Sequence, residues 1–225
     1  MILYGAAFFG TSLFFLWLFS RSGGLKPATV IVVFAAGILA GPICGMAEVF
    51  FETQVLSGPE MQHPGLRAFA LYMFGVGPIE EVGKFLAVFL IALQRADFKN
   101  SSDGILLAIC SALGFAAGEN LIYMANFGPV ATLPRLILGN LGHASFSAYW
   151  GYALGVALHE NARLTIVIEG LLLAAVLHGV YDLLLTFSIP GAIGAMLLAG
   201  LLMVLLVGFF RREGARHKLP LKKQK

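Results

Sequence analysis

Long apolar stretches separated by short polar joins fill almost the whole chain. A helix that crosses a bilayer needs about 20 apolar residues, and seven segments approach or exceed that length. They cover residues 2–19, 28–50, 68–93, 104–126, 133–158, 164–187 and 192–210. Turn-forming sequences such as Gly128-Pro129 and Pro190-Gly191 lie in the joins and favour breaks there. The pattern predicts an all-α, polytopic integral membrane protein with about seven transmembrane helices.

Composition supports a membrane protein, and charge predicts its orientation. Hydrophobic residues make up 59% of the 225 residues and charged residues 12%, whereas soluble domains carry about 25% charged residues. The positive-inside rule places the basic joins in the cytoplasm; these hold Arg21, Lys26, Arg95, Lys99, Arg163 and the basic tail 211–225. The N-terminus is therefore expected outside and the C-terminus inside. Residues 1–225 are expected to form one membrane-embedded domain, with no soluble part left to bind nucleic acid.

Glycines four residues apart occur in three of the predicted helices. They are Gly37, Gly41 and Gly45, then Gly114 and Gly118, then Gly151 and Gly155. Small residues at this spacing let membrane helices approach closely. The pattern predicts tight packing around a buried centre.

Ionisable side chains occur inside four of the predicted helices, where they are costly. A charged group near the bilayer centre costs roughly 2.5–3.5 kcal/mol. At about 1.5 Å per residue, Glu80, Glu119, His143 and His178 each lie roughly 10–18 Å from the outer end of their helix. The helices alternate in direction, so these residues are expected in one layer between the midplane and the outer third of the membrane. Their common depth predicts one shared site.

Spacing indicates which of these side chains can meet. Glu80 and Lys84 are four residues apart and share a helix face, as do His178 and Asp182. Glu81 is turned by about 100° from Glu80. One of the two glutamates is therefore expected to react and the other to support the structure.

Carboxylates and imidazoles in a dry pocket suit peptide hydrolysis. A carboxylate can take a proton from water while imidazole or amide donors stabilise the oxyanion. The same residue types could instead bind zinc, with His143, His178 and Glu119 as ligands. Because the chain has no HExxH pair, the glutamate-type mechanism is favoured. A proton- or ion-coupled transporter is the alternative function, since buried carboxylates and histidines also relay protons.

Four motifs follow one another on four consecutive predicted helices. Residues 80–84 read EExxK, residues 115–120 read FxxxEN, His143 comes next, and residues 178–182 read HxxxD. In these motifs, over residues 67–187, the chain resembles the PrsW family of intramembrane proteases, within the superfamily of CAAX-prenyl proteases and bacteriocin-processing enzymes. The CAAX branch has FxxxH and HxxxN in place of the FxxxE and HxxxD found in this chain.

The resemblance implies a multi-pass protease of the bacterial inner membrane. Its substrate would be a single-pass membrane protein, such as an anti-sigma factor, cut near the extracytoplasmic side. The resemblance implies catalytic roles for Glu80, Glu81, Glu119, His143 and His178. The residues expected to support them are Lys84, Asn120 and Asp182. No cofactor is favoured, and zinc is possible.

Overall fold

Helices make up the fold of this computed structural model, which describes residues 2–20, 24–160 and 162–218. Every predicted span is helical, and the described part contains no strand. The helices are α1 (Ile2–Ser20), α2 (Pro27–Phe50), α3 (Pro64–Ala70), α4 (Gly77–Ala92), α5 (Ser101–Thr132), α6 (Leu138–His159), α7 (Thr165–Leu185) and α8 (Ser188–Lys218). The predicted all-α fold is confirmed.

Four helical segments of the described chain are long and apolar enough to cross a membrane by length and composition. They are Pro27–Val55, Ser101–Val130, Thr165–Leu185 and Ser188–Phe209. Helix α6 also has a suitable length of 22 residues. Its mean hydropathy is lowered by polar residues that point inward, including the buried Asn140, His143 and Ser147. The polar groups that weaken this span are thus part of the protein interior.

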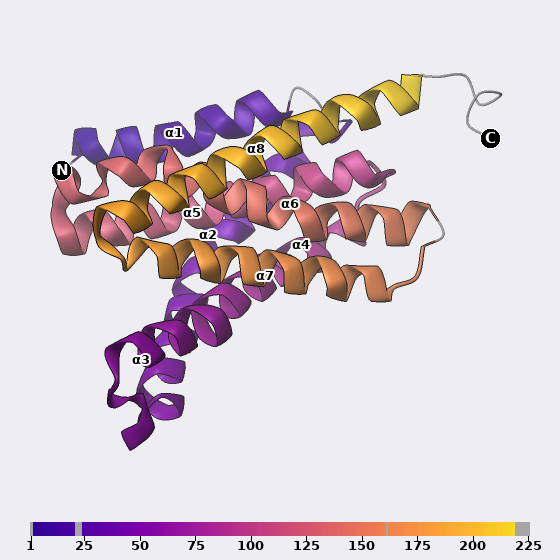
Figure 1. The fold of residues 1–225 in the computed structure, drawn as a ribbon. Coiled ribbons are helices and arrows are strands. Elements are labelled where there is room, and N and C mark those ends of the chain that lie inside the picture. Colours follow the sequence, from indigo (N-terminus) through magenta and orange to yellow (C-terminus); the bar gives the residue numbers. More distant parts are fainter. Residues whose placement is uncertain (1, 21–23, 161, 219–225) are drawn as a thin grey trace.

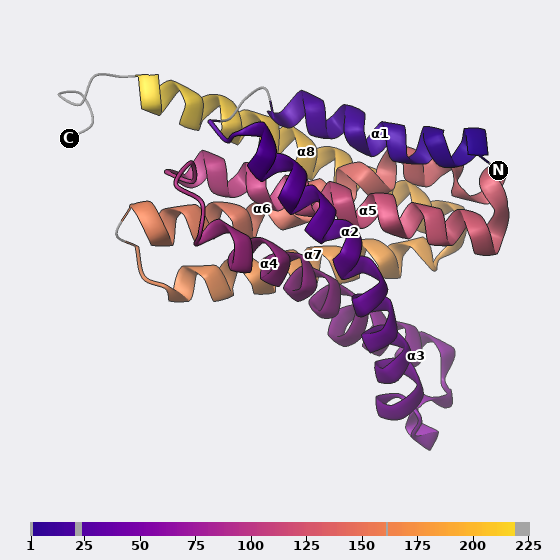
Figure 2. The ribbon, with the colours of Figure 1, turned by 180° about the vertical axis from the view of Figure 1, so that it is seen from behind.

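The helices form an elongated bundle with α5 at its centre. Helices α1, α5, α6, α7 and α8 run alongside one another in both views (Figures 1 and 2). Helix α5 is buried over most of its length, whereas α8 is largely exposed on the outside. The beginning of α1 and the end of α8 lie at opposite ends of the bundle (Figure 1). An odd number of membrane crossings requires this placement.

An arm leans out from the bundle between α2 and α4. It comprises residues 46–74, which include the end of α2, a π-helical turn (Phe51–Val55), a short 3-10 helix (Pro59–Gln62) and α3. Figures 1 and 2 show the arm diverging from the other helices. Large apolar side chains on it are exposed, among them Met46, Phe50 and Phe74. In a membrane these side chains would face lipid.

The predicted third helix, 68–93, is a longer and bent helical segment. It begins at Pro64, passes through a π-helical stretch (Leu71–Val76) and continues as α4. The ring of Pro78 cannot follow an ordinary α-helical turn because it clashes with the carbonyl four residues earlier. The wider π turn accommodates it. This irregularity lies one turn before Glu80 and sets the direction of α4.

The other helix ends differ from prediction by several residues. Helix α5 continues past the predicted end to Thr132, bending at Gly128, whose φ of 81° is outside the helical range. Helix α8 begins before Pro190, because proline fits the first turn of a helix. It extends to Lys218, so part of the predicted tail 211–225 is helical. Residues 219–225 of the tail, and Arg21 near α1, lie outside the described residues.

Candidate active site

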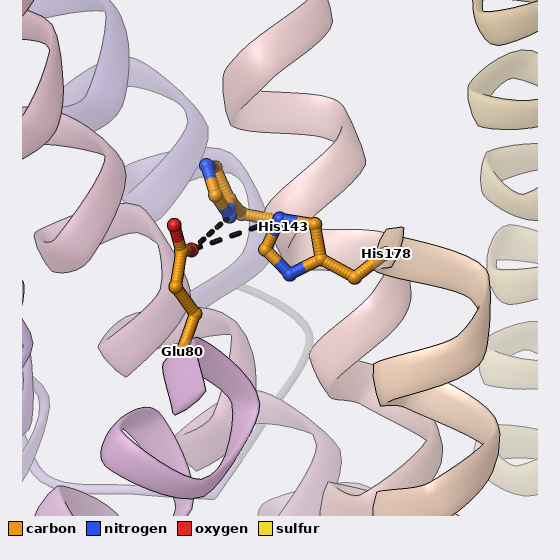
Figure 3. Close-up of side chains that lie close together, drawn as sticks. All are labelled: Glu80, His143 and His178. Atoms are coloured by element: carbon orange, nitrogen blue, oxygen red, sulfur yellow. Dashed lines mark ion pairs between the residues drawn. The ribbon is translucent and has the colours of Figure 1, made fainter. Parts of the chain in front are cut away.

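The polar residues predicted for the site meet between four helices. Helix α4 carries Glu80, Glu81 and Lys84, α5 carries Glu119 and Asn120, α6 carries His143, and α7 carries His178 and Asp182. Figure 3 shows Glu80, His143 and His178 pointing toward one another from three of these helices. The convergence that common depth predicted is confirmed by their contacts.

Two glycines bring α4 and α7 close enough for this meeting. A side chain added at Gly77 would overlap backbone atoms of α7. One added at Gly179 would overlap the backbone just before α4. Only glycine permits such an approach. Glu80 lies one turn after Gly77, and His178 directly precedes Gly179, so the close contact places the carboxylate beside the imidazole.

Lys84 lies at the centre of the cluster and has no exposed surface. Its Nζ is 3.0 Å from Oε2 of Glu80 and 2.9 Å from Oε1 of Glu81. The same nitrogen is 2.9 Å from Nδ1 of His143. The predicted pairing with Glu80 is confirmed, and the structure adds two further partners. A buried ammonium requires such compensation, because removing a charge from water is costly.

Glu81 is hydrogen-bonded through both of its oxygens and is fully buried. Oε1 accepts from Lys84 and lies 3.1 Å from Nδ1 of His178. Oε2 accepts from Oγ of Ser147 at 2.7 Å and from Nε1 of Trp150 at 2.9 Å. This carboxylate is thus occupied by donors from three helices. Its geometry suits an orienting role better than a reaction with water.

The protonation of His143 follows from its neighbours. The Lys84 ammonium can only donate, so Nδ1 of His143 accepts. The ring hydrogen is then on Nε2, which lies 3.0 Å from Oε2 of Glu119 and donates to it. The other oxygen of Glu119 pairs with Arg135 at 2.6 Å. The guanidinium of Arg135 in turn lies over the ring of Tyr123, 3.9 Å from its centre. A continuous chain of contacts therefore orients the imidazole.

Asn120 belongs to the edge of this network. Its Oδ1 accepts from Nε of Arg135 at 3.3 Å. Its Nδ2 is buried and has no hydrogen-bond partner among the residues that the structure describes. Asn120 thus contacts Arg135, the partner of Glu119, rather than the histidines.

His178 faces carboxylates with both ring nitrogens. Nδ1 points to Glu81, while Nε2 lies 3.3 Å from Oδ2 of Asp182 and 3.6 Å from Oε2 of Glu80. The predicted pairing of His178 with Asp182 is confirmed. Since carboxylate oxygens are acceptors, a proton on Nε2 or a cation between these atoms makes the arrangement favourable.

Three of the central side chains fit a divalent cation. Glu80, His143 and His178 each offer a ligand atom, and these atoms lie within 4.8 Å of one another. The other nitrogen of each ring faces a second carboxylate, from Glu119 or Glu81. Metal-ligating histidines are commonly oriented in this way. Two imidazoles and a carboxylate also form a known zinc ligand set.

The predicted ligand set of His143, His178 and Glu119 needs a correction. The structure groups Glu80, not Glu119, with the two histidines. Glu119 is held away from this group by Arg135 and by the far nitrogen of His143. Lys84 occupies the lone pair of His143 Nδ1, so a cation on the three ligands would require Lys84 to release that nitrogen.

Two cavities adjoin the cluster. The larger, of about 400 Å³, lies between α2, α4, α5 and α7 and is lined in part by Glu80. The smaller, of about 10 Å³, is lined in part by His143 and His178, and its size is close to the minimum for one water. Glu119, Arg135 and Asp182 line both cavities. A substrate and a water can therefore approach the cluster from adjoining spaces.

The predicted site leaves out three residues of this network. Ser147 and Trp150 follow His143 by four and seven positions, so all three share one face of α6. That spacing could have placed both residues at the site. Arg135 lies at the beginning of the predicted helix 133–158 and is not among the expected site residues. No local pattern marks it, because the turn that leads it back to Glu119 depends on the tertiary fold.

Comparison with known proteins decides the family. The model of the PrsW family intramembrane metalloproteases matches residues 26–210. The chain belongs to the PrsW family. Protease PrsW of Shouchella clausii is 35% identical over 163 residues, which cover 72% of each chain. The Halalkalibacterium halodurans protein of the same name is 30% identical over 173 residues, or 76% of each chain. Protease PrsW of Bacillus subtilis is 30% identical over 129 residues, covering 56% of this chain and 59% of that protein.

Membership of the PrsW family identifies the chain as a membrane protein and a protease. The resemblance drawn from the four motifs is confirmed, and the protease interpretation is supported over the transporter alternative. No solved structure matches the chain significantly.

Proposed function

We propose that this PrsW-family protein is an endopeptidase of the bacterial cell membrane in which Glu80 activates the attacking water. The observation that carries this role is the position of the Glu80 carboxylate. Its Oε2 lies 3.7 Å from Nδ1 of His143 and 3.6 Å from Nε2 of His178, while the residue also lines the larger cavity. Glu80 thus joins the buried cluster to the space where a peptide can enter.

The chain's own residues account for each proton in the hydrolysis. Figure 3 shows the second oxygen of Glu80 turned away from both rings, where it can accept a proton from water. The water oxygen then bonds to the scissile carbonyl carbon, and the oxyanion accepts a hydrogen bond from Nε2–H of His178. When the C–N bond breaks, Glu80 returns its proton to the departing amine. A carboxylic acid and an amine are formed, and Glu80 is again ionised.

The remaining side chains hold this geometry. Lys84 and Glu81 fix Glu80 and His178 through the contacts described above. Asp182 orients His178 through the contact between its Oδ2 and Nε2 of the imidazole. Glu119 fixes the orientation of His143. The proposed catalytic set is therefore Glu80 and His178, with His143 and Glu119 beside them.

We further propose that the substrate is a single-pass membrane protein, such as an anti-sigma factor, cut near its extracytoplasmic side. Family membership supports a membrane-anchored substrate. The distribution of lysine and arginine supports an outward-facing site. It favours an N-terminus outside the cell, and with that orientation the ionisable residues lie in the outer half of the membrane.

A comparison of membrane proteomes tests this function. Fragments of single-pass proteins are expected in cells with the wild-type chain and absent with Glu80→Gln. The matched control is Glu60→Gln, an exposed acid of the arm that lines neither cavity. Identical fragments with the wild type and with correctly inserted Glu80→Gln protein would refute the proposed role of Glu80.

A metal-dependent form of the same hydrolysis is the second candidate. The three ligand atoms within 4.8 Å and the description of the matching family favour it. Glu80, His143 and His178 would hold the metal, which would polarise the scissile carbonyl and activate water. Measuring the metal content and activity of purified protein before and after chelation separates the two forms. Loss of stoichiometric zinc together with activity supports the metal-dependent form, whereas full activity of metal-free protein supports the glutamate form.

A further inference from the structure

The larger cavity opens where the arm leaves the bundle. Upstream on α2, a side chain added at Gly37 would overlap the backbone of α5. One turn later the helices separate, because a Cβ at Gly41 would be 3.9 Å from the nearest atom and one at Gly45 would meet nothing within 4 Å. Both of these glycines line the cavity. Figure 2 shows α2 diverging from the bundle over this stretch.

The cavity extends from this opening to the reaction centre. Its wall includes Glu80, the proposed base, and Glu119, the partner of His143. It also includes Tyr72 on the arm and Asp182 on α7. With a volume of about 400 Å³, it falls within the usual range of pockets that hold a small ligand or a few residues of a peptide. A peptide held in it would touch the atoms that cut it.

The cations around this cavity are already paired. Arg135 is 2.6 Å from Glu119 and also covers the ring of Tyr123. Arg67 pairs with Glu52 at 3.2 Å near the end of α2. Lys84, behind the cavity wall, is shared between Glu80 and Glu81.

Glu48 differs from Glu52, Glu80 and Glu119, the acids that pair with these cations. It lies on α2, lines the cavity and is half-buried. No hydrogen bond or ion pair to its carboxylate occurs among the described residues, whereas Glu52, one turn later, has Arg67. An acid at membrane depth is costly unless it has a partner or lies in a polar cavity. The vacant acceptors of Glu48 therefore point to the chemistry of the occupant.

We propose that this cavity binds the substrate segment around the scissile bond and that Glu48 selects a lysine or arginine side chain in it. The inference rests on the proposed endopeptidase function and deepens it. Charge complementarity decides between occupants, because an anionic lipid headgroup would meet the carboxylates of Glu48, Glu80 and Asp182. A cationic side chain gains a charge-assisted hydrogen bond from the same groups.

Binding of defined peptides to the full-length chain tests the proposal without requiring cleavage. The protein is placed in nanodiscs of neutral phosphatidylcholine with Glu80→Gln in every sample, so that peptides stay intact. The probes are labelled transmembrane peptides of leucine and alanine whose juxtamembrane segment carries one lysine, one glutamine or one glutamate. We expect the lysine peptide to bind at least about tenfold more tightly than the glutamate peptide, given the strength of hydrogen bonds to charged groups.

Variants of Glu48 show whether this residue is responsible. Adding Glu48→Gln should reduce the lysine preference to less than about threefold, and Glu48→Lys should reverse it. Glu60→Gln is the control and should leave the preference intact, because Glu60 lies outside the cavity lining. Equal binding of the three peptides, no binding of any of them, or a preference that survives Glu48→Gln would overturn the proposal.

Cleavage is measured separately with wild-type protein and the lysine peptide. Binding that depends on Glu48 without any cleavage would support the cavity assignment and argue against the proposed endopeptidase. Cleavage that is insensitive to the charge of the peptide would support the endopeptidase and overturn the selection by Glu48.

Discussion

The ammonium nitrogen of Lys84 lies 2.9 Å from Nδ1 of His143, which is 59 residues further along the chain. This contact joins α4 to α6 in the centre of the protein. Because an ammonium cannot accept a hydrogen bond, it also determines which nitrogen of the imidazole carries the hydrogen. The same lysine forms ion pairs with two buried glutamates. Lys84 thus links the charge balance of the site to the orientation of its histidine.

Replacing Lys84 should destabilise the protein strongly. Lys84→Met keeps the length of the side chain but leaves Glu80 and Glu81 without their cation. Breaking a buried ion pair by removing one partner costs about 3–5 kcal/mol. We expect a loss of this size in the free energy of unfolding, measured by denaturant titration of purified protein in mixed micelles. Lys99→Met, at an exposed position before α5, is the control, and equal stability of the two variants would contradict the role of Lys84.

The two adjacent glutamates should respond differently to the same substitution. Glu80→Gln should lower the rate of peptide cleavage by at least about 10²-fold, the lower range for loss of a general base. Its effect on stability should be smaller than that of Lys84→Met, because Lys84 keeps Glu81 as its counter-ion. Glu81→Gln places an amide nitrogen where an oxygen accepts hydrogen bonds, so at least one buried donor loses its partner. The expected loss of stability is about 1–3 kcal/mol.

Both glutamine variants need activity and unfolding measurements on the same preparations. The assignment of Glu80 as base predicts a stable, inactive Glu80→Gln protein. An active Glu80→Gln protein beside a stable but inactive Glu81→Gln protein would transfer the base role to Glu81.

Much of the fold could be predicted because a helix that crosses a membrane appears in the sequence as a long apolar segment. The ionisable residues were placed in one layer from helix depth alone, and contacts such as the one between Glu80 and His178 confirm it. Pairs on a single helix, such as His178 with Asp182, followed from the helical repeat. These features depend only on local geometry.

Features that depend on how helices meet could not be predicted. The contact between Arg135 and Glu119 requires the bend at Gly128 and the turn that follows α5. The choice of Glu80 over Glu119 as neighbour of both histidines depends on side-chain direction across α4, α6 and α7. The divergence of the arm likewise arises from packing, since equal glycine spacing along α2 gives contact at Gly37 and open space at Gly45.

Arg135 should influence cleavage through Glu119. Arg135→Gln removes the ion pair at 2.6 Å and leaves the Glu119 carboxylate free to change its contact with Nε2 of His143. We expect kcat to fall about 10-fold or more, as for the loss of one or two charged hydrogen bonds. Arg67→Gln is the control, because its exposed pair with Glu52 is worth only about 0–1 kcal/mol.

If Arg135 has a positioning role, Arg135→Gln should change the dependence of kcat on pH, and a conservative substitution should restore part of kcat. Arg135→Lys restores the charge without the forked geometry, so it should recover part of kcat. If Arg135→Gln has the same kcat and the same dependence of kcat on pH as the wild type, the contact with His143 alone is sufficient to hold Glu119.

Alanine substitutions on α2 should separate the packed part of this helix from the part that faces the cavity. A Cβ at Gly37 would overlap the carbonyl of Ser111 on α5, so the helices must move apart. Such overpacking costs about 1–3 kcal/mol. A Cβ at Gly45 would meet nothing within 4 Å, so Gly45→Ala should be neutral or stabilise the helix by up to about 1 kcal/mol. Unfolding in mixed micelles measures both effects, and equal losses of stability in the two variants would show that α2 packs against α5 along its whole length.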